Sequence, residues 1–177
     1  MRTVFRAGLA AALGLVATTS HAAQTVAQDA CLTQAEATAL FLTVAPTILK
    51  SVSGKCIKVL PESAYLRING EALIARYAGP SAAAKPAAIA AFNKISGEAK
   101  LDESMFEMMT GEILGEIVAG DVKPDECMKF DRIAGLLDPM PPENIAGLLI
   151  AFVEFADEKG GDKEKKKAGP FSICKAA

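Results

Sequence analysis

The sequence predicts an all-α fold, a small disulfide-stabilised bundle of about five or six helices. Apolar residues recur at spacings of three and four along several segments, which glycines and prolines separate. No stretch of useful length alternates apolar and polar residues as a half-buried strand does. Four cysteines, an even number in a chain that begins with an export signal, predict two disulfides.

The amino terminus predicts export. Arg2 and Arg6 precede an apolar run over residues 7–17, and Ser20 and Ala22 then fill the small-residue positions of a cleavage site. The run is shorter than the roughly 20 apolar residues that span a bilayer. We therefore interpret residues 1–22 as a signal peptide. Residues 23–177 are expected to form one helical domain, periplasmic or secreted, with no membrane insertion.

The composition of this mature domain argues against several function classes. Cleavage removes His21, the only histidine, and with it the usual general base and metal ligand. Removing Arg2 and Arg6 from 19 basic residues leaves 17 against 21 acidic residues, a net charge of −4. Mild acidity gives no indication of a nucleic-acid partner. The chain has no phosphate-binding glycine loop and no C-x-x-C motif, so we expect no cofactor and no metal.

The first predicted helix begins at a capping box. Thr33 is the expected N-cap residue, and Glu36 the residue that reaches back to it. Pro46 inside the helix is expected to kink it, and Ser53-Gly54 to end it.

The middle of the chain is less regular. Pro61 is placed as a first helical residue, and Asn69-Gly70 is expected to interrupt the helix that follows. One continuous helix over residues 61–78 with a tolerated glycine remains an alternative. Residues 79–81, Gly-Pro-Ser, are expected to break the chain before a helix over residues 82–95.

A helix over residues 102–119 is expected to pack on two faces. One side carries large apolar residues, and roughly the opposite side carries small ones that let another backbone come close. This pattern slightly favours a homodimer. The apolar side is Phe106, Met109, Ile113 and Ile117, and the small side is Gly111, Gly115 and Ala119.

Two further helices complete the predicted bundle. One begins at Pro124, and the other runs from Glu143 to about Asp157. The second is apolar almost all round, so we expect it to be the central, most buried helix. A charged linker over about residues 159–169 follows, and Cys174 ties the C-terminal segment back.

A methionine cluster is the first candidate for chemistry. Met105, Met108 and Met109 could in principle bind Cu(I), because thioethers are soft ligands. Their helical spacing favours the simpler interpretation that they fill gaps in the core.

Charged clusters are the second candidate. Glu103 with Glu107, and Glu112 with Glu116, are carboxylate pairs four residues apart, and we interpret them as the solvated edge of a helix. Asp162 and Glu164 sit among the lysines Lys163, Lys165, Lys166 and Lys167, which favours a solvated linker over a phosphate or lipid site.

All four cysteines, Cys31, Cys56, Cys127 and Cys174, are expected to be disulfide-bonded. A first helix of about 30 Å separates Cys31 from Cys56, too far for the roughly 7 Å that a disulfide allows. Alternating helices favour Cys31–Cys127 with Cys56–Cys174. If one long helix runs through Gly79-Pro80, the number of times that the chain crosses the bundle changes by one, and the later helices begin at the opposite ends. Cys31–Cys174 with Cys56–Cys127 then becomes the better pairing.

The leading functional prediction is a non-enzymatic protein that binds a protein partner, as an inhibitor, immunity protein or holdase does. The alternative is a hydrolase-type enzyme that uses only carboxylate, hydroxyl or lysine groups. A polar cleft with converging groups would favour the enzyme, and a bundle whose carboxylates face water would favour the binding protein.

Overall fold

The computed structural model describes residues 31–97, 100–164 and 172–174, with the side chains of the last helix described through Phe155. The predicted all-α, disulfide-tied bundle is confirmed, and the described residues contain no strand beyond one isolated bridge. The predicted signal peptide, residues 1–22, lies outside the described residues. The elements are α1 Gln34–Cys56, α2 Tyr65–Arg76, α3 Ala78–Ile95, α4 Glu103–Met108, the π-helix η1 Met109–Ile113, α5 Leu114–Asp121, the 3-10 turn η2 Pro124–Glu126, α6 Cys127–Leu137 and α7 Pro142–Glu164.

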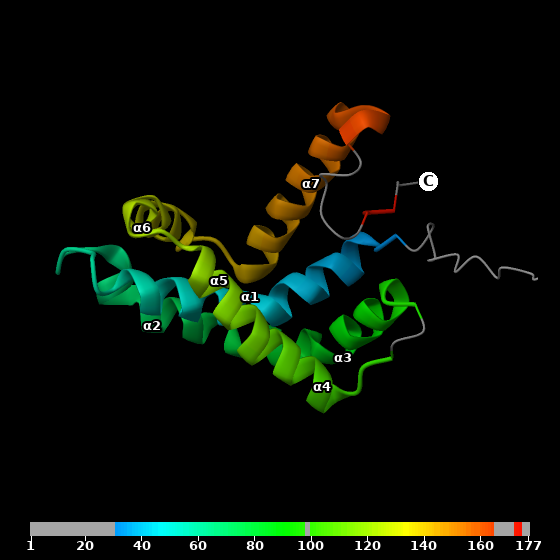
Figure 1. The fold of residues 1–177 in the computed structure, drawn as a ribbon, viewed down its shortest axis with the longest axis horizontal. Coiled ribbons are helices and arrows are strands. Elements are labelled where there is room, and N and C mark those ends of the chain that lie inside the picture. The colour runs from blue at the N-terminus through cyan, green and yellow to red at the C-terminus, as the bar shows by residue number, and fades with distance from the viewer. Residues whose placement is uncertain (1–30, 98–99, 165–171, 175–177) are drawn as a thin grey trace, which may run out of the picture.

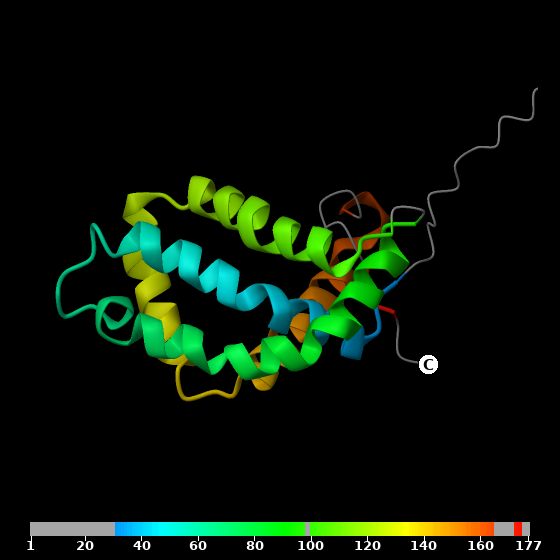
Figure 2. The same cartoon turned by 90° about the horizontal axis from the view of Figure 1, so that it is seen from below.

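Helix α1 is the centre of the bundle, and α2, α3, α5, α6 and α7 all contact it (Figures 1 and 2). Its predicted capping box is confirmed: Glu36 N donates to Thr33 Oγ1 at 3.2 Å, and Thr33 N donates to Glu36 Oε2 at 2.7 Å. The predicted end at Ser53-Gly54 is wrong, because the helix continues to Cys56, whose side chain is buried. In the described part of the chain, α1 is also the one helix long and apolar enough to cross a membrane, a test that core helices pass too.

Helix α7 is not the central helix that the sequence predicts. Its first half enters the core through Ile145, Ala146 and Ile150. Beyond these residues it extends past the other helices (Figure 1), and Gln34 Nε2 of α1 donates to Glu154 Oε1 at 3.0 Å. Phe152 is 61% exposed. Apolar residues on all sides of a helix do not show that the other helices surround it. In this fold the other helices surround α1. The helix also continues to Glu164, so residues 159–164 of the predicted linker are helical. Residues 165–169 of that linker lie outside the described residues.

The predicted interruption at Asn69-Gly70 is wrong, because α2 runs through it without a break. Gly70 is buried, and a Cβ built on it would lie 3.0 Å from Ser53 Oγ of α1. The glycine therefore allows α2 to come close to α1. A rule that considers only neighbouring residues mistakes this glycine for a helix breaker. The prediction of a first helical residue at Pro61 is also wrong, since α2 begins at Tyr65.

Helices α2 and α3 follow one another almost directly, because Tyr77 alone separates them. The predicted break at residues 79–81 lies inside the first turn of α3. A proline is tolerated there because the first N–H groups of a helix have no intrahelical partner. Figure 2 shows the two helices forming one long, bent edge of the molecule.

This long edge decides the disulfide pairing. The favoured pairing, Cys31–Cys127 with Cys56–Cys174, is wrong, and the alternative is observed. We call Cys31–Cys174 the terminal disulfide and Cys56–Cys127 the core disulfide. Because the chain crosses the molecule once along α2 and α3 instead of twice, the start of α6 returns to the C-terminal end of α1. The rejection of a Cys31–Cys56 pair is confirmed.

The two disulfides have different surroundings. The core disulfide is fully buried, at 0% exposure for Cys56 and 1% for Cys127. Both cysteines of the terminal disulfide are half-buried. Beside them the backbone of the C-terminal segment pairs with that of Leu32: Leu32 N donates to Ser172 O, and Cys174 N donates to Leu32 O, each at 2.8 Å.

Candidate functional site

The helical rod formed by α4, η1 and α5 lies along one outer edge of the molecule, beside α1 (Figure 2). Asp102 caps it, with Oδ1 accepting from Met105 N at 2.8 Å. Its middle is the π-helix η1, in which Leu114 N donates to Met109 O, five residues back. A π turn contains one residue more than an α turn, so it changes which later residues face the core.

The π turn rotates the predicted apolar stripe out of the core. Phe106 is buried, and Met109 packs beside it, as predicted. Beyond η1, Val118 packs on the main core, whereas Ile113 and Ile117 are about half exposed. The prediction that Ile113 and Ile117 face inward is therefore wrong. It assumed 3.6 residues per turn throughout, and η1 inserts one more.

Four large apolar side chains consequently line the outside of this rod. They are spaced by three, five and four residues, and the spacing of five spans the π turn. Each is between 47% and 56% exposed. We call them the outer stripe. Its members are Met105, Met108, Ile113 and Ile117.

The outer stripe also corrects the interpretation of the methionine cluster. Met105 and Met108 are exposed and do not fill gaps in the core, and Met109 alone among the three packs inward. Contiguous exposed apolar side chains are typical of interaction sites. Methionine is common at such sites because its unbranched, polarisable side chain adapts to different partners.

Acidic side chains surround the outer stripe. Residues 101–122 contain six acids and no Lys, Arg or His. Lys85 of α3 pairs with Glu103 at 3.5 Å and with Glu107 at 2.5 Å. Glu112 and Glu116 are exposed, and among the described residues neither is in an ion pair.

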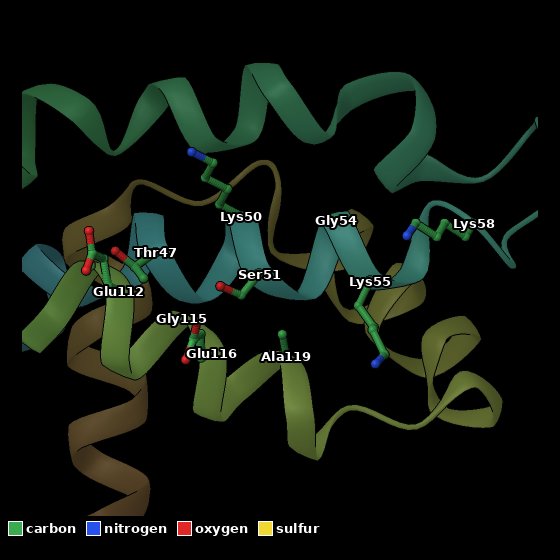
Figure 3. Close-up of a pocket in the computed structure, with 11 residues that line it drawn as sticks. Thr47, Lys50, Ser51, Gly54, Lys55, Lys58, Glu112, Gly115, Glu116 and Ala119 are labelled. Atoms are coloured by element: carbon green, nitrogen blue, oxygen red, sulfur yellow. The ribbon is translucent and has the colours of Figure 1, made fainter.

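A groove separates the inner side of α5 from α1 (Figure 3). At its floor the helices come close: a Cβ on Gly115 would lie 3.1 Å from Ser51 Oγ and 3.5 Å from Thr47 Cγ2. The prediction that a second backbone packs on the small residues is confirmed at Gly115. That backbone is α1 of the same chain, so this face gives no support to a homodimer. The groove is lined by Thr47, Lys50, Ser51, Gly54, Lys55, Lys58, Gly111, Glu112, Gly115, Glu116 and Ala119.

This groove is where the alternative enzyme would have its polar groups. Figure 3 shows Lys50 directed away from α5 and Lys55 directed towards its C-terminal end. In the described part of the chain, no hydrogen bond joins Ser51 to a lysine or a carboxylate, and no group of three potential metal ligands is brought together. An activated hydroxyl needs a base within hydrogen-bond reach, and among the described residues no such base contacts Ser51.

A second apolar surface lies on the outward side of the middle of α7. Phe152 is exposed, as are Leu148, Leu149 and Val153. A shallow hollow beside them, lined by Leu148, Ala151, Phe152 and Phe155, is almost entirely apolar. Unlike the outer stripe, it has no acidic residue among the side chains that line it.

Comparisons of the chain with protein-family models, with curated proteins and with solved structures found no match. The function therefore has to be inferred from the chain itself. Of the residues singled out from the sequence, the structure joins the four cysteines in two pairs and places Glu112 and Glu116 beside the outer stripe. The four side chains of the outer stripe were not predicted from the sequence to form an exposed surface. The six acids of residues 101–122, with no Lys, Arg or His among them, were a signal that could have predicted it.

Proposed function

We propose that this protein is exported to the periplasm or secreted, and that it acts by binding a protein partner through the outer stripe. The basic, apolar, small-residue start of the chain supports export. The two disulfides support it as well, because such bonds persist in oxidising compartments. The observation that carries the binding function is the row of four exposed apolar side chains, in which the π turn brings Ile113 and Ile117 to the outside beyond Met105 and Met108.

The outer stripe by itself supports only part of a stable complex. Burying a large apolar side chain completely contributes about 1.5–3 kcal/mol. Covering the exposed half of four such side chains would therefore contribute about 3–6 kcal/mol. Association opposes this with roughly 4–15 kcal/mol of lost freedom. A partner must also contact the groups that flank the stripe, and these flanking groups are acidic.

Affinity capture with matched variants tests this function. The mature, oxidised protein is immobilised beside the double variant Ile113→Ser/Ile117→Ser and the control Leu136→Ser. Leu136 is 66% exposed on α6, so its replacement removes a similar apolar side chain from a different surface. We expect a partner that the native protein and the control retain and the double variant loses. Equal capture by all three proteins would refute the proposal.

The fold of each variant has to be checked first by circular dichroism and thermal unfolding. With about half of each isoleucine covered, the double variant should lose about 1.5–3 kcal/mol and the control about 0.5–1 kcal/mol. Capture is therefore carried out at a temperature at which all three proteins are fully folded. Versions of the proposed function include an inhibitor, an immunity protein and a holdase. A holdase would retain many unfolded chains, whereas an inhibitor or immunity protein would retain one partner in fixed stoichiometry.

A further inference from the structure

We infer that the partner segment covering the outer stripe is a basic amphipathic helix, with apolar residues on one face and Lys or Arg beside them. This inference rests on the proposed function and adds the chemistry of the partner. It is carried by the distribution of charge around the stripe and by the length and composition of the stripe.

Charge complementarity is the first argument. Glu112 and Glu116 border the C-terminal half of the stripe, and Asp102 and Asp121 lie just beyond its two ends. All four are exposed, and none is in an ion pair among the described residues. A partner that brings cations to this border would gain from every one of these carboxylates, and an acidic partner would be repelled.

The lysines of the neighbouring groove form no ion pair with this border. Lys50 and Lys55 of α1, with Lys58 in the turn just after it, line the opposite side of the groove, and in the described structure none of them is within ion-pair distance of Glu112 or Glu116. Both carboxylates therefore keep their hydrogen-bonding capacity for a ligand. Ionised carboxylates accept strong, short hydrogen bonds from Lys and Arg side chains.

The dimensions of the stripe fit a short helix. From Met105 to Ile117 the rod rises about 18 Å at about 1.5 Å per residue. A partner helix of about 12 residues would match this length. It would present apolar residues at spacings of three and four, as amphipathic helices do in apolar grooves. Two of the four stripe residues are methionines, which adapt to different apolar faces.

A second copy of this chain fits the same surface poorly. In a two-fold dimer the same patch faces itself, so the acids that border one stripe would meet the acids that border the other. Like charges placed opposite one another across an interface are unfavourable. The charge pattern therefore favours a different, basic partner.

The test uses two designed peptides as probes. One is a blocked 14-residue helix of Leu and Lys in an amphipathic pattern, and the other carries Glu in place of every Lys. Binding to the mature, oxidised protein is measured by calorimetry at low and moderate salt. We expect the Lys peptide to bind at least about tenfold more tightly than the Glu peptide and to weaken with salt, because exposed charges are screened. Equal binding of the two peptides would overturn the inference.

Variants locate the binding site. Glu112→Gln/Glu116→Gln keeps the shape of both side chains and should weaken the Lys peptide several-fold. Glu62→Gln/Glu71→Gln, a control at two exposed acids elsewhere, should leave it unchanged. The inference is refuted if both pairs weaken binding equally, or if neither does. A dimer in size-exclusion chromatography that Ile113→Ser/Ile117→Ser dissociates would also refute it, by showing that a second copy is the occupant.

The two proposals fail separately. If the natural partner is captured through the stripe but the Lys peptide does not bind there, the proposed function stands and the basic chemistry of the partner is wrong. If Ile113→Ser/Ile117→Ser changes neither capture nor peptide binding, the stripe is not a binding site and both proposals are wrong.

Discussion

Two phenylalanines that differ in burial give the sharpest test of the fold. Phe106 is 1% exposed and packs edge-to-face on Phe92, with ring centroids 6.1 Å apart, whereas Phe152 on α7 is 61% exposed. Replacing a buried phenylalanine by alanine typically destabilises by about 3–5 kcal/mol, so we expect that loss for Phe106→Ala. Burying a phenylalanine completely contributes about 1.5–3 kcal/mol. With 39% of Phe152 covered, Phe152→Ala should therefore lose only about 1 kcal/mol.

The assay is urea unfolding of the mature, oxidised protein, followed by circular dichroism. The free energies of unfolding of both variants are compared with that of the native protein. The two variants remove the same side chain, so the difference between them isolates burial from side-chain chemistry. A loss above about 3 kcal/mol for Phe152→Ala would show that α7 lies in the core, as its apolar sequence suggests. A loss below about 1 kcal/mol for Phe106→Ala would refute the packing of the rod on the bundle.

Four further predictions follow from the same structure. A limiting dithiol should reduce the terminal disulfide before the core disulfide, which is shielded from attack; alkylation and peptide mapping would show the order. Burial raises the pKa of Tyr65 to about 12, and the nearby Asp138 carboxylate adds to this effect. Burial also raises the pKa of Tyr77. A pH titration followed by tyrosinate absorbance should therefore show no tyrosine titrating at the ordinary pKa of 10.0. Because both folded pKa values are raised, the stability that these two groups contribute is fully present below about pH 10 and is lost as the pH rises through the folded pKa values, which for Tyr65 is about 12. Gly54→Ala, in open helical surroundings, should stabilise by up to about 1 kcal/mol, whereas Gly70→Ala should not, since its Cβ would press on α1; urea unfolding measures both. Deleting Gly111 removes the extra residue of the π turn, so the residues before and after it keep the faces that they now present to the core while the turn itself becomes α-helical. We expect a loss of less than about 1 kcal/mol in the same assay.

The two disulfides cross-link opposite ends of the molecule in different surroundings. The core disulfide lies inside the main apolar core, where the ends of α1 and the start of α6 meet. The terminal disulfide instead fastens the last described residues to the start of α1. Both bonds close long loops, of 71 and 143 residues in sequence separation, and such cross-links stabilise chiefly by restricting the unfolded chain. The outer stripe lies on the rod between them and contains no cysteine.

Several features of the structure could be predicted from the sequence because they depend on residues a few positions apart. The capping box at Thr33 is such a feature, since the side chains of Thr33 and Glu36 meet within one turn. The helical character of nearly every segment is another, because apolar spacing repeats within each helix. The bonding of all four cysteines could also be predicted, since their number and an export signal suffice.

Other features were decided only by the tertiary structure, because they depend on how whole helices run and meet. Ala64 at the start of α2 has no side chain that can cap it, and Asp131 of α6, 65 residues away, accepts the hydrogen bond from Leu66 N at 2.7 Å. The pairing of the cysteines depended on whether α2 and α3 cross the molecule once or twice. The direction of Ile113 and Ile117 depended on one extra residue in η1, which stays where it is because Phe106 packs on one side of the π turn and Val118 on the other. The sequence therefore determined that this chain is helical and cross-linked, and the packing of helices around α1 decided which apolar residues remained exposed.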